Sequence, residues 1–471
     1  MPHKDIALMA HLMRRAGFGA HRDELELRVA KGYESTVEEL LDPKAHGIPQ
    51  LDERLMFRRC PSYRLPGNPM SAAGYWMYRL INSPRPLEEK ITLLWHQIFA
   101  TAVSKVAHPP EMIRQIAMFR RYGMGSYRRL LLKLSKNPAM IFWLDNNENH
   151  KNAPNENWGR ELLELFSMGQ GNYSETDVKE CARAFTGWTL AATIPGILYN
   201  RFQWEFEYRE SDHDQNEKCF LGEQGNLNGE DIIDIILKQP ATARFLARHL
   251  YNFFVADEVP VPSWHNEPAR DPHAIEILAK TLTESGFNIR STLRVLFNSD
   301  FFKTERCWFS KVKSPVEVVT NTMKFVGNFK KFRPGFSQLG EEVSFQGQTL
   351  LNPPSVEGWH TGPEWIDTGT LLQRINFVAD QMVNPHLPGI RYMIDRLNSQ
   401  NLSTSEELVD GCLDLMGPIQ LEPKTRQEIV THIKINETTE QDPLKFSNLI
   451  SSEKVGQILQ LVVSTREFQM G

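Results

Sequence analysis

The sequence predicts a mainly α-helical, multi-helix globular protein with a small β-hairpin insertion, and two patterns support this fold class. Apolar residues recur three and four positions apart through most of the 471 residues, in segments that start with Asn, Ser, Asp or Pro and end with Gly. The segment 201–208 instead alternates strictly between apolar and polar residues, as a half-buried strand does. The hydrophobic share of 41% is sufficient for a globular core.

The N-terminal part is predicted to form helices packed around one central helix. The expected helices cover residues 5–16, 22–31, 34–41, 111–122 and 126–135, and a Pro- and Arg-rich connection covers 43–68. The central helix begins at the Ser83-Pro84 cap and runs to about Ala107, because apolar residues lie on nearly all its faces. The Arg14-Arg15-Ala-Gly-Phe-Gly sequence ends the first helix. It is a poor match to a nucleotide phosphate loop, since no strand precedes it and a Lys-Ser/Thr pair is absent.

His96, on the central helix, is a candidate metal ligand. In helical projection it lies between Leu93 and Val103, so its ring should be largely buried. A buried imidazole needs a partner for its ring nitrogens. That partner is a backbone carbonyl or a carboxylate if the residue is structural, and a metal ion or a substrate if it is functional.

The stretch 137–188 contains the most informative part of the chain. Asn155 begins a helix that runs to about Met168 and stops at a Gly-rich turn. Ser174 then caps another helix, and Asp177 follows three residues later, as in a capping box.

Glu161 is the carboxylate of the 155–168 helix that we expect to be drawn into the interior. It projects between Met168 and Leu165, at the edge of the apolar face, and Glu164 lies one step closer to solvent. A buried carboxylate must be paired, protonated or bound to a metal. Two interpretations stay open: a structural ion pair with an arginine such as Arg183, or a catalytic or metal-binding role.

A β-hairpin is expected near 200–222, with the strand 201–208 pairing with 218–222. The connection between them contains His213 and Asp214. An imidazole and carboxylates on a loop held by two strands suit a metal site or proton transfer. They also suit Asx-type turns that satisfy backbone N–H groups, so both interpretations stay open.

The C-terminal half is predicted to be helical, with one rigid aromatic turn. Helices are expected at 229–238, 241–254, 272–285, 289–299, 315–327 and 367–381, and a loop is expected at 328–348. The turn from Asn352 to Trp365 contains Trp359 and Trp365. These two rings suit stacking on a sugar or a proline-rich peptide, or packing that fixes the turn to the core.

The chain is expected to divide into a main helical domain, 1–382, and a C-terminal helical subdomain, 383–471. The subdomain is marked by polar loops and weaker motifs. Its expected helices cover residues 387–398, 405–416, 423–435 and 453–466.

Composition narrows the function classes. The formal net charge of −5 is small for this length, so no nucleic-acid partner is expected. The longest apolar runs are far shorter than a membrane span. Five scattered cysteines without a C-x-x-C pair favour reduced thiols. The beginning, MPHKDIALMAHL, lacks a basic region followed by an apolar core, so we expect a cytoplasmic location.

Several motifs, in order, carry a family resemblance over roughly residues 10–380. They are HLMRRAGFGA (11–20), LLWHQIF (93–99), NENWGRELLELFSMGQGNYSETDV (155–178), ARAFTGW (182–188), HD followed by Lys and FLG (213–222) and NPPSVEGWHTGPEWI (352–366). The chain resembles the bacterial family catalogued as domain of unknown function 1800. The resemblance implies a bacterial source and a mainly helical fold, and it implies no established activity. It also implies a sulfatase-like partner protein, encoded beside many members. Many members are exported, and the start of this chain departs from that pattern.

Two functional hypotheses of different classes follow. The first is a metal-dependent or carboxylate/histidine acid–base enzyme, with Glu161, His213 and Asp214 as catalytic residues. A divalent metal ion would be bound by residues from distant segments, namely His96, Glu161, Glu164, His213 and Asp214. This hypothesis requires these groups to converge in one pocket. The second is a non-catalytic scaffold, or a glycan- or protein-binding module, that uses Trp359 and Trp365 and works with the sulfatase-like partner. The absence of G-x-S-x-G and of a phosphate loop disfavours serine hydrolases and nucleotide enzymes.

Overall fold

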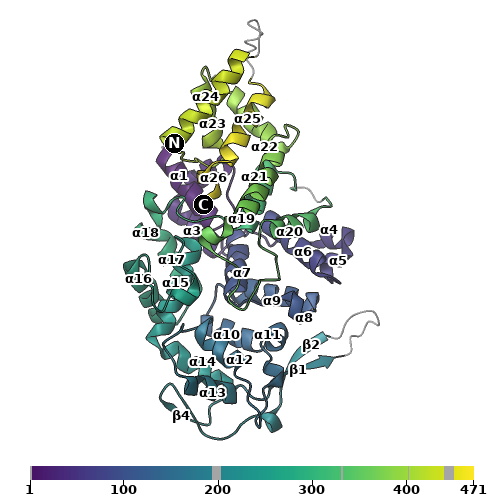
Figure 1. Cartoon of the computed structure of the whole chain (residues 1–471), viewed down its shortest axis with the longest axis vertical. Coiled ribbons are helices and arrows are strands. Elements are labelled where there is room, and N and C mark those ends of the chain that lie inside the picture. The colour runs from purple at the N-terminus through teal and green to yellow at the C-terminus, as the bar shows by residue number, and fades with distance from the viewer. Residues whose placement is uncertain (1–2, 194–202, 330–332, 401, 440–449) are drawn as a thin grey trace.

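The computed structural model describes residues 3–193, 203–329, 333–400, 402–439 and 450–471, and Figure 1 labels its elements. Of the described residues, 63% are helical, and the strands among them form two small two-stranded antiparallel sheets. The predicted fold class, mainly α with a small β insertion, is therefore confirmed.

The elements follow one another along the chain with short connections. The first group is α1 (His3–Arg15), α2 (Arg22–Lys31), α3 (Tyr33–Leu41), α4 (Arg54–Arg59), α5 (Pro61–Arg64), α6 (Pro69–Asn82), α7 (Pro86–Ile98), α8 (Val103–Val106), α9 (Pro109–Tyr122), α10 (Tyr127–Ser135), α11 (Pro138–Trp143), η1 (Asn146–Glu148), α12 (Asn157–Glu164) and α13 (Glu175–Ala184). The second group is β1 (Trp188–Thr193), β2 (Gln203–Tyr208), η2 (Glu210–Asp212), β3 (Lys218–Phe220) and β4 (Glu223–Gly225).

Helices then continue to the end of the chain. The third group is α14 (Gly229–Lys238), α15 (Pro240–Phe254), η3 (Val261–Ser263), α16 (Pro272–Glu284), α17 (Ile289–Asn298), α18 (Asp300–Lys303), η4 (Glu305–Cys307), α19 (Pro315–Val326), α20 (Phe336–Phe345) and η5 (Gly362–Trp365). The last group is α21 (Thr368–Met382), α22 (Pro388–Asn398), α23 (Ser405–Leu415), α24 (Pro423–Thr439), α25 (Ser452–Val463) and α26 (Arg466–Gln469).

Helix α7 lies near the middle of an elongated molecule (Figure 1). Helices α22 to α25 form the upper end, α12 to α14 and the strands form the lower end, and α4 to α6 with α20 form a lateral wing. Even polar residues of α7, such as Glu89, Lys90 and Thr92, are buried. The prediction that this helix is central to the core is confirmed.

The predicted helix from Ser83 to Ala107 is wrong in its length. Helix α7 ends at Ile98, and the short helix α8 begins at Val103. The backbone N–H of Val103 donates to the carbonyl of Leu351 at 2.9 Å, so a distant segment replaces the helical hydrogen bond there. The apolar periodicity continues from α7 into α8, because both helices face the same core, so the pattern does not show where α7 ends.

Two regions expected to lack helices contain them. The connection 43–68 includes α4 and α5, and the expected loop 328–348 includes α20. These helices have four to ten residues, which is too few turns for a clear periodic pattern. Helix α20 packs closely on α6, because a Cβ on Gly340 would lie 3.1 Å from the Cβ of Ala73.

The expected strand pairing is also wrong. Strand β2 pairs with β1, with Trp188 opposite Tyr208, and β3 pairs with β4 across a tight turn. Positions 201 and 202 of the predicted strand lie outside the described residues. The ring of Phe206 contacts that of Trp188 at 5.4 Å between centroids. This aromatic contact favours β1, a strand that had no alternation signal of its own.

One hydrophobic core extends from Ile6 to Phe468. It crosses the predicted boundary between 1–382 and 383–471, as do backbone contacts such as the hydrogen bond from Lys313 N–H to Gln469 O at 2.9 Å. The division into a main domain, 1–382, and a C-terminal helical subdomain, 383–471, stays a prediction.

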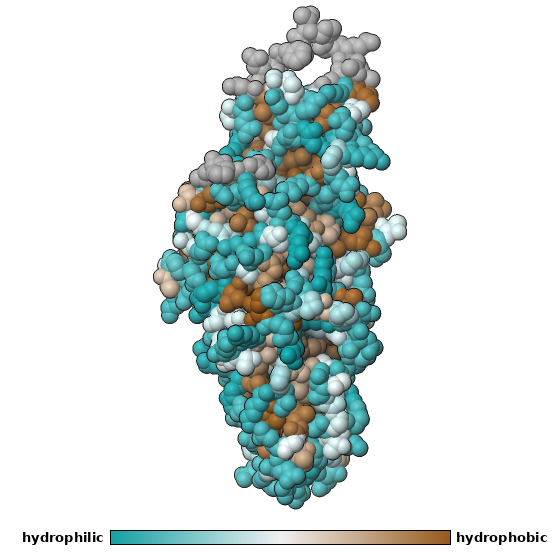
Figure 2. All heavy atoms as spheres, turned by 90° about the vertical axis from the view of Figure 1, so that its left-hand side faces the viewer, coloured by the Kyte–Doolittle hydropathy of each residue, from teal (hydrophilic) through white to brown (hydrophobic). Residues whose placement is uncertain are grey.

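The surface of the described residues alternates between polar and apolar side chains. On the face seen in Figure 2, hydrophobic residues form separate patches among hydrophilic ones. Within the described part of the chain, no helix has both the length and the apolar character required to cross a membrane.

Candidate functional site

Helix α12 places Glu161 at the edge of the core. Trp158 and Leu162 of this helix are buried. Gly159 faces α13 so closely that a Cβ there would lie 3.1 Å from the carbonyl of Val178, and the two helices therefore pack with their backbones in contact. Glu161 is half-buried in this arrangement, as its position in the helical projection predicts.

The carboxyl group of Glu161 lies in an environment that favours its neutral form. Burial, together with the carboxylates of Glu164 and Glu357 and against the opposing charge of Arg160, raises the pKa of Glu161 to about 7. Among the described residues, no hydrogen bond or ion pair reaches the Glu161 carboxylate. Glu161 is therefore a carboxyl group that can exchange a proton near neutral pH.

The arginines near Glu161 bind other carboxylates. Arg160 pairs with Glu175 at 2.8 Å. Arg183 pairs with Asp214 at 2.7 Å. The interpretation of Glu161 as the partner of Arg183 is therefore wrong, because that guanidinium is engaged at the other end of α13.

The two carboxylates that act on Glu161 are held by different elements. Glu164 accepts a hydrogen bond from the hydroxyl of Tyr173 at 2.9 Å and another from the amide of Gln170. Glu357 belongs to the turn before η5. A Cβ on the next residue, Gly358, would collide with the carbonyl of Gln97, so the turn is pressed against the end of α7.

Two neighbouring pockets flank this group and share Leu165 and Val261 as wall residues. The polar lining of the first pocket is Gln97, His249, Asn252, Lys311, Glu357 and Thr361. The polar lining of the second includes Glu164, Gln170, Asn172 and His265. Glu161 is not among the wall residues of either pocket, but the two carboxylates that act on it are, Glu357 in the first and Glu164 in the second. The amide, imidazole and ammonium groups of this polar cleft can bind a polar ligand.

His249 is a neutral imidazole in the first pocket. Burial, together with the charge of Arg248, lowers its pKa to about 3. Its ring packs against Phe245 and Trp264, with centroids 4.7 and 4.6 Å away. Its Nε2 is buried without a hydrogen-bond partner among the described residues. His249 carries no distinctive pattern in the sequence, and the available signal is its three-residue spacing from Asn252, which puts both on one helix face.

His96 occupies an aromatic cage in the core. Its ring centroid lies 5.5 Å from that of Trp76 and 5.0 Å from that of Trp359. Burial lowers its pKa to about 3, and within the described part of the chain neither ring nitrogen has a hydrogen-bond partner. The carboxylate or carbonyl partner expected for a structural histidine is therefore not found.

His213 and Asp214 form a local structural network. His213 Nδ1 lies 2.8 Å from the carbonyl oxygen of Thr186, and Asp214 accepts hydrogen bonds from Arg183 at 2.7 Å and from the N–H of Asn216 at 2.9 Å. Burial alone would raise the pKa of Asp214, but these bonds outweigh it and hold the pKa below its usual value. This geometry matches the Asx-turn interpretation of the loop.

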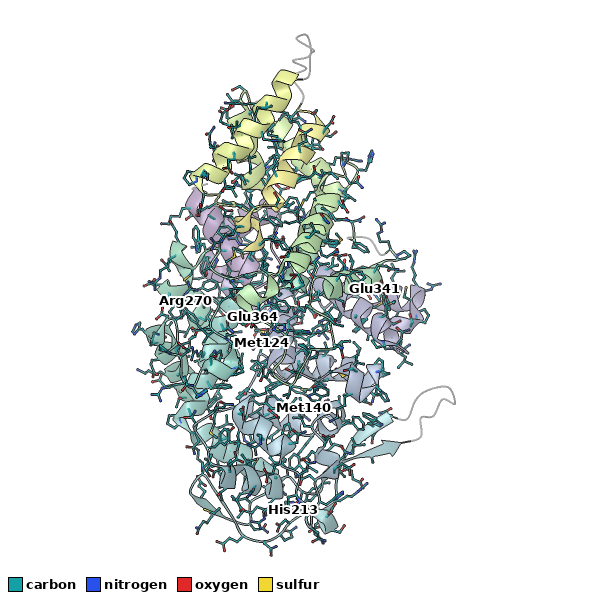
Figure 3. All side chains as sticks on the ribbon, viewed as in Figure 1. Met124, Met140, His213, Arg270, Glu341 and Glu364 are labelled. Carbon is teal, nitrogen blue, oxygen red and sulfur yellow. The ribbon has the colours of Figure 1, made fainter. Side chains whose placement is uncertain are left out.

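The expected convergence of these residues on one metal ion does not occur. Figure 3 shows His213 near the lower end of the molecule, whereas Glu364, which belongs to the same aromatic turn as Trp359, lies near the middle. His96 contacts Trp359, so the two histidines are far apart. In the part of the chain that the structure describes, no group of three or more His, Cys, Asp or Glu side chains is placed to hold a metal ion. Periodicity predicts that a side chain points inward, but not which part of the interior it reaches.

Trp359 and Trp365 are buried, each with 5% of its surface exposed. The indole N–H of Trp359 donates to the carbonyl of Thr349 at 3.2 Å. The rings fix the aromatic turn to the core, and stacking on a glycan or a peptide would require them to leave it.

Comparison with known proteins gives a family but no named relative. The model of a family described as "Protein of unknown function (DUF1800)" matches residues 11–470, nearly the whole chain. No curated protein and no solved structure matches the chain.

Proposed function

The chain belongs to the DUF1800 family, whose function is unknown, and we propose from the site alone that it is an acid–base enzyme with Glu161 as its proton-transfer group. The observation that carries the proposal is a half-buried carboxyl group that has no partner among the described residues and is influenced by two further carboxylates, which line the walls of a polar cleft. A general acid or base is most effective when its pKa lies near the working pH, and this environment provides such a pKa.

Each surrounding group has a distinct part in this proposal. Glu164 and Glu357 keep the pKa of Glu161 high, so Glu161 can donate and accept a proton near neutral pH. His249 offers an uncharged imidazole nitrogen, and Lys311 offers a positive charge anchored by Asp257 at 2.8 Å. These two groups support binding of a polar substrate with a negatively charged or carbonyl oxygen.

The metal-dependent form of the hypothesis finds no support in the described ligand geometry, and the form without a metal is the one we propose. His96, His213 and Asp214 have no part in it, because they lie in separate structural environments. A cytoplasmic location stays a prediction.

The test is a comparison of wild-type protein with Glu161→Gln and the matched control Glu205→Gln, which alters an exposed carboxylate on β2. Each would be assayed against a panel of esters, glycosides, amides and phosphoesters, with folding checked by thermal unfolding. We expect turnover that falls about 10²–10⁴-fold in Glu161→Gln only, as is usual for loss of a general acid or base. Equal turnover by all three proteins would refute the proposal.

A second function, docking of a partner protein, is favoured by one observation on the lateral wing. Four large apolar side chains there are exposed by half or more: Leu55, Leu65, Met70 and Phe345. Helices α6 and α20 run antiparallel, since Phe336 contacts Tyr78 with centroids 5.2 Å apart and Gly340 contacts Ala73. This register brings Phe345 toward the Met70 end of α6.

The sulfatase-like protein implied by the family resemblance is the partner we propose for this surface. Co-purification of the two proteins would support docking if it is lost in Phe345→Ser and retained in an exposed control such as Leu372→Ser. If both variants still co-purify with the partner, the lateral wing is not part of the interface.

A further inference from the structure

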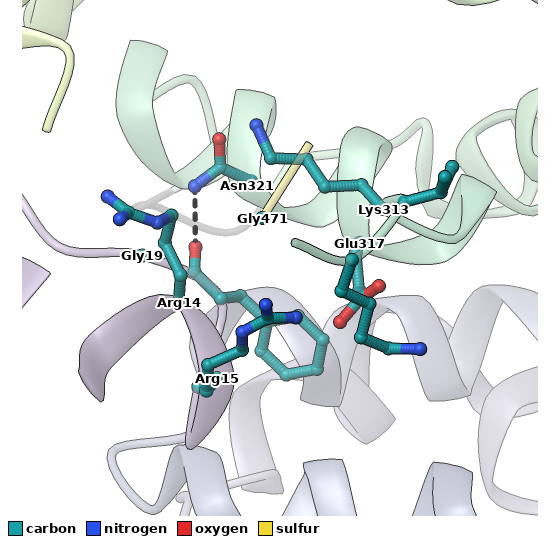
Figure 4. A pocket seen from close by; sticks show the side chains of 11 residues that line it. Arg14, Arg15, Gly19, Lys313, Glu317, Asn321 and Gly471 are labelled. Carbon is teal, nitrogen blue, oxygen red and sulfur yellow. Dashed lines mark hydrogen bonds between the residues drawn. The ribbon is translucent and has the colours of Figure 1, made fainter. Parts of the chain in front are cut away.

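A second cluster of charge lies apart from Glu161, where the end of α1 meets the start of α19. Figure 4 shows Arg14 and Arg15 on one side of a pocket and Lys313, Glu317 and Asn321 on the other. We call this the cationic pocket, and its walls are Arg14, Arg15, Gly17, Phe18, Gly19, Lys311, Val312, Lys313, Glu317, Asn321 and Gly471. The Arg14-Arg15-Ala-Gly-Phe-Gly motif therefore meets residues about 300 positions later in the chain.

The two acidic groups in or beside the cationic pocket are already paired. Glu317, the one acidic side chain in its wall, pairs with Lys90 and also accepts the N–H of Ser314 at 2.8 Å. Asp257 pairs with Lys311 at 2.8 Å. Both carboxylates also attract Arg15, but each is already paired with a lysine, so the cations of this region outnumber them.

Three cations of the cationic pocket have only neutral partners among the described residues. Arg14 donates to the carbonyl of Gly417 at 2.8 Å, and Arg15 donates to that of Cys307 at 3.2 Å. The ammonium of Lys313 donates to a backbone carbonyl at 2.6 Å. The side-chain Nε of both arginines is buried without a hydrogen-bond partner in the described structure. Arg15 is only 4% exposed, so water does not compensate its charge.

A further unpaired guanidinium lies behind Lys313. Arg374 is fully buried and donates through Nη1 to the Lys313 carbonyl at 2.7 Å, while its Nε and Nη2 have no partner among the described residues. Burial, with added repulsion from Arg14, lowers the pKa of Lys313 to about 7. Removing unpaired charges from water is strongly unfavourable, and the buried cations of this region exceed its carboxylates, so it has a deficit of negative charge.

The local backbone suits a small ligand. A Cβ on Gly19 would collide with the amide of Asn321, whose nitrogen donates to Phe18 O at 2.9 Å (Figure 4). These contacts hold the loop against α19 and leave a cavity of about 20 Å³. This volume accommodates about one oxygen-sized group, so one oxygen atom of a ligand can enter the cavity and the rest of the ligand must lie at its mouth.

We propose that the cationic pocket binds a compact oxyanion of the phosphate or sulfate type, as the free ion or as the terminal group of a larger molecule. Guanidinium groups bind tetrahedral oxyanions through charge-assisted hydrogen bonds, and a bound dianion would supply the negative charge that the pocket lacks. The cationic pocket and the polar cleft near Glu161 share Lys311 as a wall residue. The variants that test the cationic pocket are therefore placed at Lys313 and Arg14 and leave Lys311 and Glu161 unchanged.

The test is calorimetric titration of the full chain with inorganic phosphate, sulfate and glycerol phosphate in Tris–chloride at constant ionic strength. We expect saturable binding of one anion per chain and a rise in unfolding temperature with anion concentration. Tighter binding of the free ion would identify an inorganic ligand, and tighter binding of the ester would identify the end of a larger molecule. No saturable binding, which is the result if the pocket is already neutralised, would overturn the proposal.

Single substitutions test whether the anion binds in the cationic pocket. Lys313→Gln should weaken phosphate binding about tenfold, the effect of losing one charge-assisted hydrogen bond. Arg14→Gln gives a second variant in case the first does not fold, and exposed Arg58→Gln is the matched control. Equal binding by wild type and either folded pocket variant would place the anion elsewhere and refute the assignment.

Discussion

The carboxylate of Glu164 accepts a hydrogen bond from the hydroxyl of Tyr173 at 2.9 Å. This bond fixes a negative charge one helical turn from Glu161, where it raises the pKa of the Glu161 carboxyl group. Tyr173 follows the Gly-rich turn after α12, so this turn helps to keep the pKa of Glu161 high.

Replacing Glu164 by Gln should therefore lower the pKa of Glu161. The pKa should remain above the ordinary glutamate value of 4.5, because burial is the larger cause of its rise. Carboxyl carbon NMR titration of the variant measures this directly, with Glu205→Gln as control. An unchanged or higher pKa would show that Glu164 does not act on Glu161.

Glu161→Gln should change how stability depends on pH. The folded-state pKa of Glu161 is raised to about 7, so its protonated form contributes stability that is fully present below 4.5 and lost as pH rises through 7. Gln mimics the neutral acid at every pH. At pH 8 the variant should be more stable than wild type by about 1–2 kcal/mol, a value reduced for the partial exposure of the group. Urea unfolding between pH 4 and 9 tests this, and a constant difference across that range would contradict it.

Gly358→Ala should destabilise the protein by more than about 1 kcal/mol. Its φ of 96° is unfavourable for an L side chain, and the added Cβ would strike the carbonyl of Gln97. Because the turn also carries Glu357, the pKa of Glu161 should fall at the same time. Gly67→Ala, where a Cβ meets nothing within 4 Å, is the matched control for the denaturation experiment. Equal stability of the two variants would show that the turn can move away from α7 at no cost.

Asp214→Asn should reduce stability without affecting any activity that depends on Glu161. Loss of the charge-assisted bond to Arg183 corresponds to about 1.5–3 kcal/mol at pH 7. The pKa of Asp214 is held below 3.8, so its contribution is present above that pH and is lost as pH falls through the folded-state pKa. Denaturation at pH 7 and pH 3 should therefore show a smaller difference at the lower pH. If the variant is as stable as wild type but inactive, Asp214 is a catalytic residue and its structural assignment is wrong.

Local features of this fold could be predicted from sequence, and long-range placements could not. The helical projection of α12 places Glu161 at the edge of the core, and the capping box of Ser174 and Asp177 is present as expected. These features depend on residues within one or two turns of each other. The strand pairing of β2 depends instead on β1, whose six residues carry no pattern that identifies a partner.

The residues that form the cleft near Glu161 and the cationic pocket could not be predicted from the sequence, because they come from distant segments of the chain. His249 is one histidine on an amphipathic helix, and only the packing of α15 beside the turn of Glu357 gives it a pocket. Arg15 and Lys313 look like ordinary helix-end cations, and their proximity follows from the contact of α1 with the start of α19. His96 is predicted from the sequence to be buried, and His213 is predicted to lie on a loop. The distance between them depends on the whole fold and cannot be read from either local pattern.

The most direct test of the acid–base account is the pKa of Glu161 in the wild-type protein, measured by carboxyl carbon NMR on selectively labelled glutamate and assigned with Glu161→Gln. The account predicts a midpoint near 7. A midpoint near 4.5, the ordinary glutamate value, would contradict it, because Glu161 would then be an ionised carboxylate of no special proton affinity.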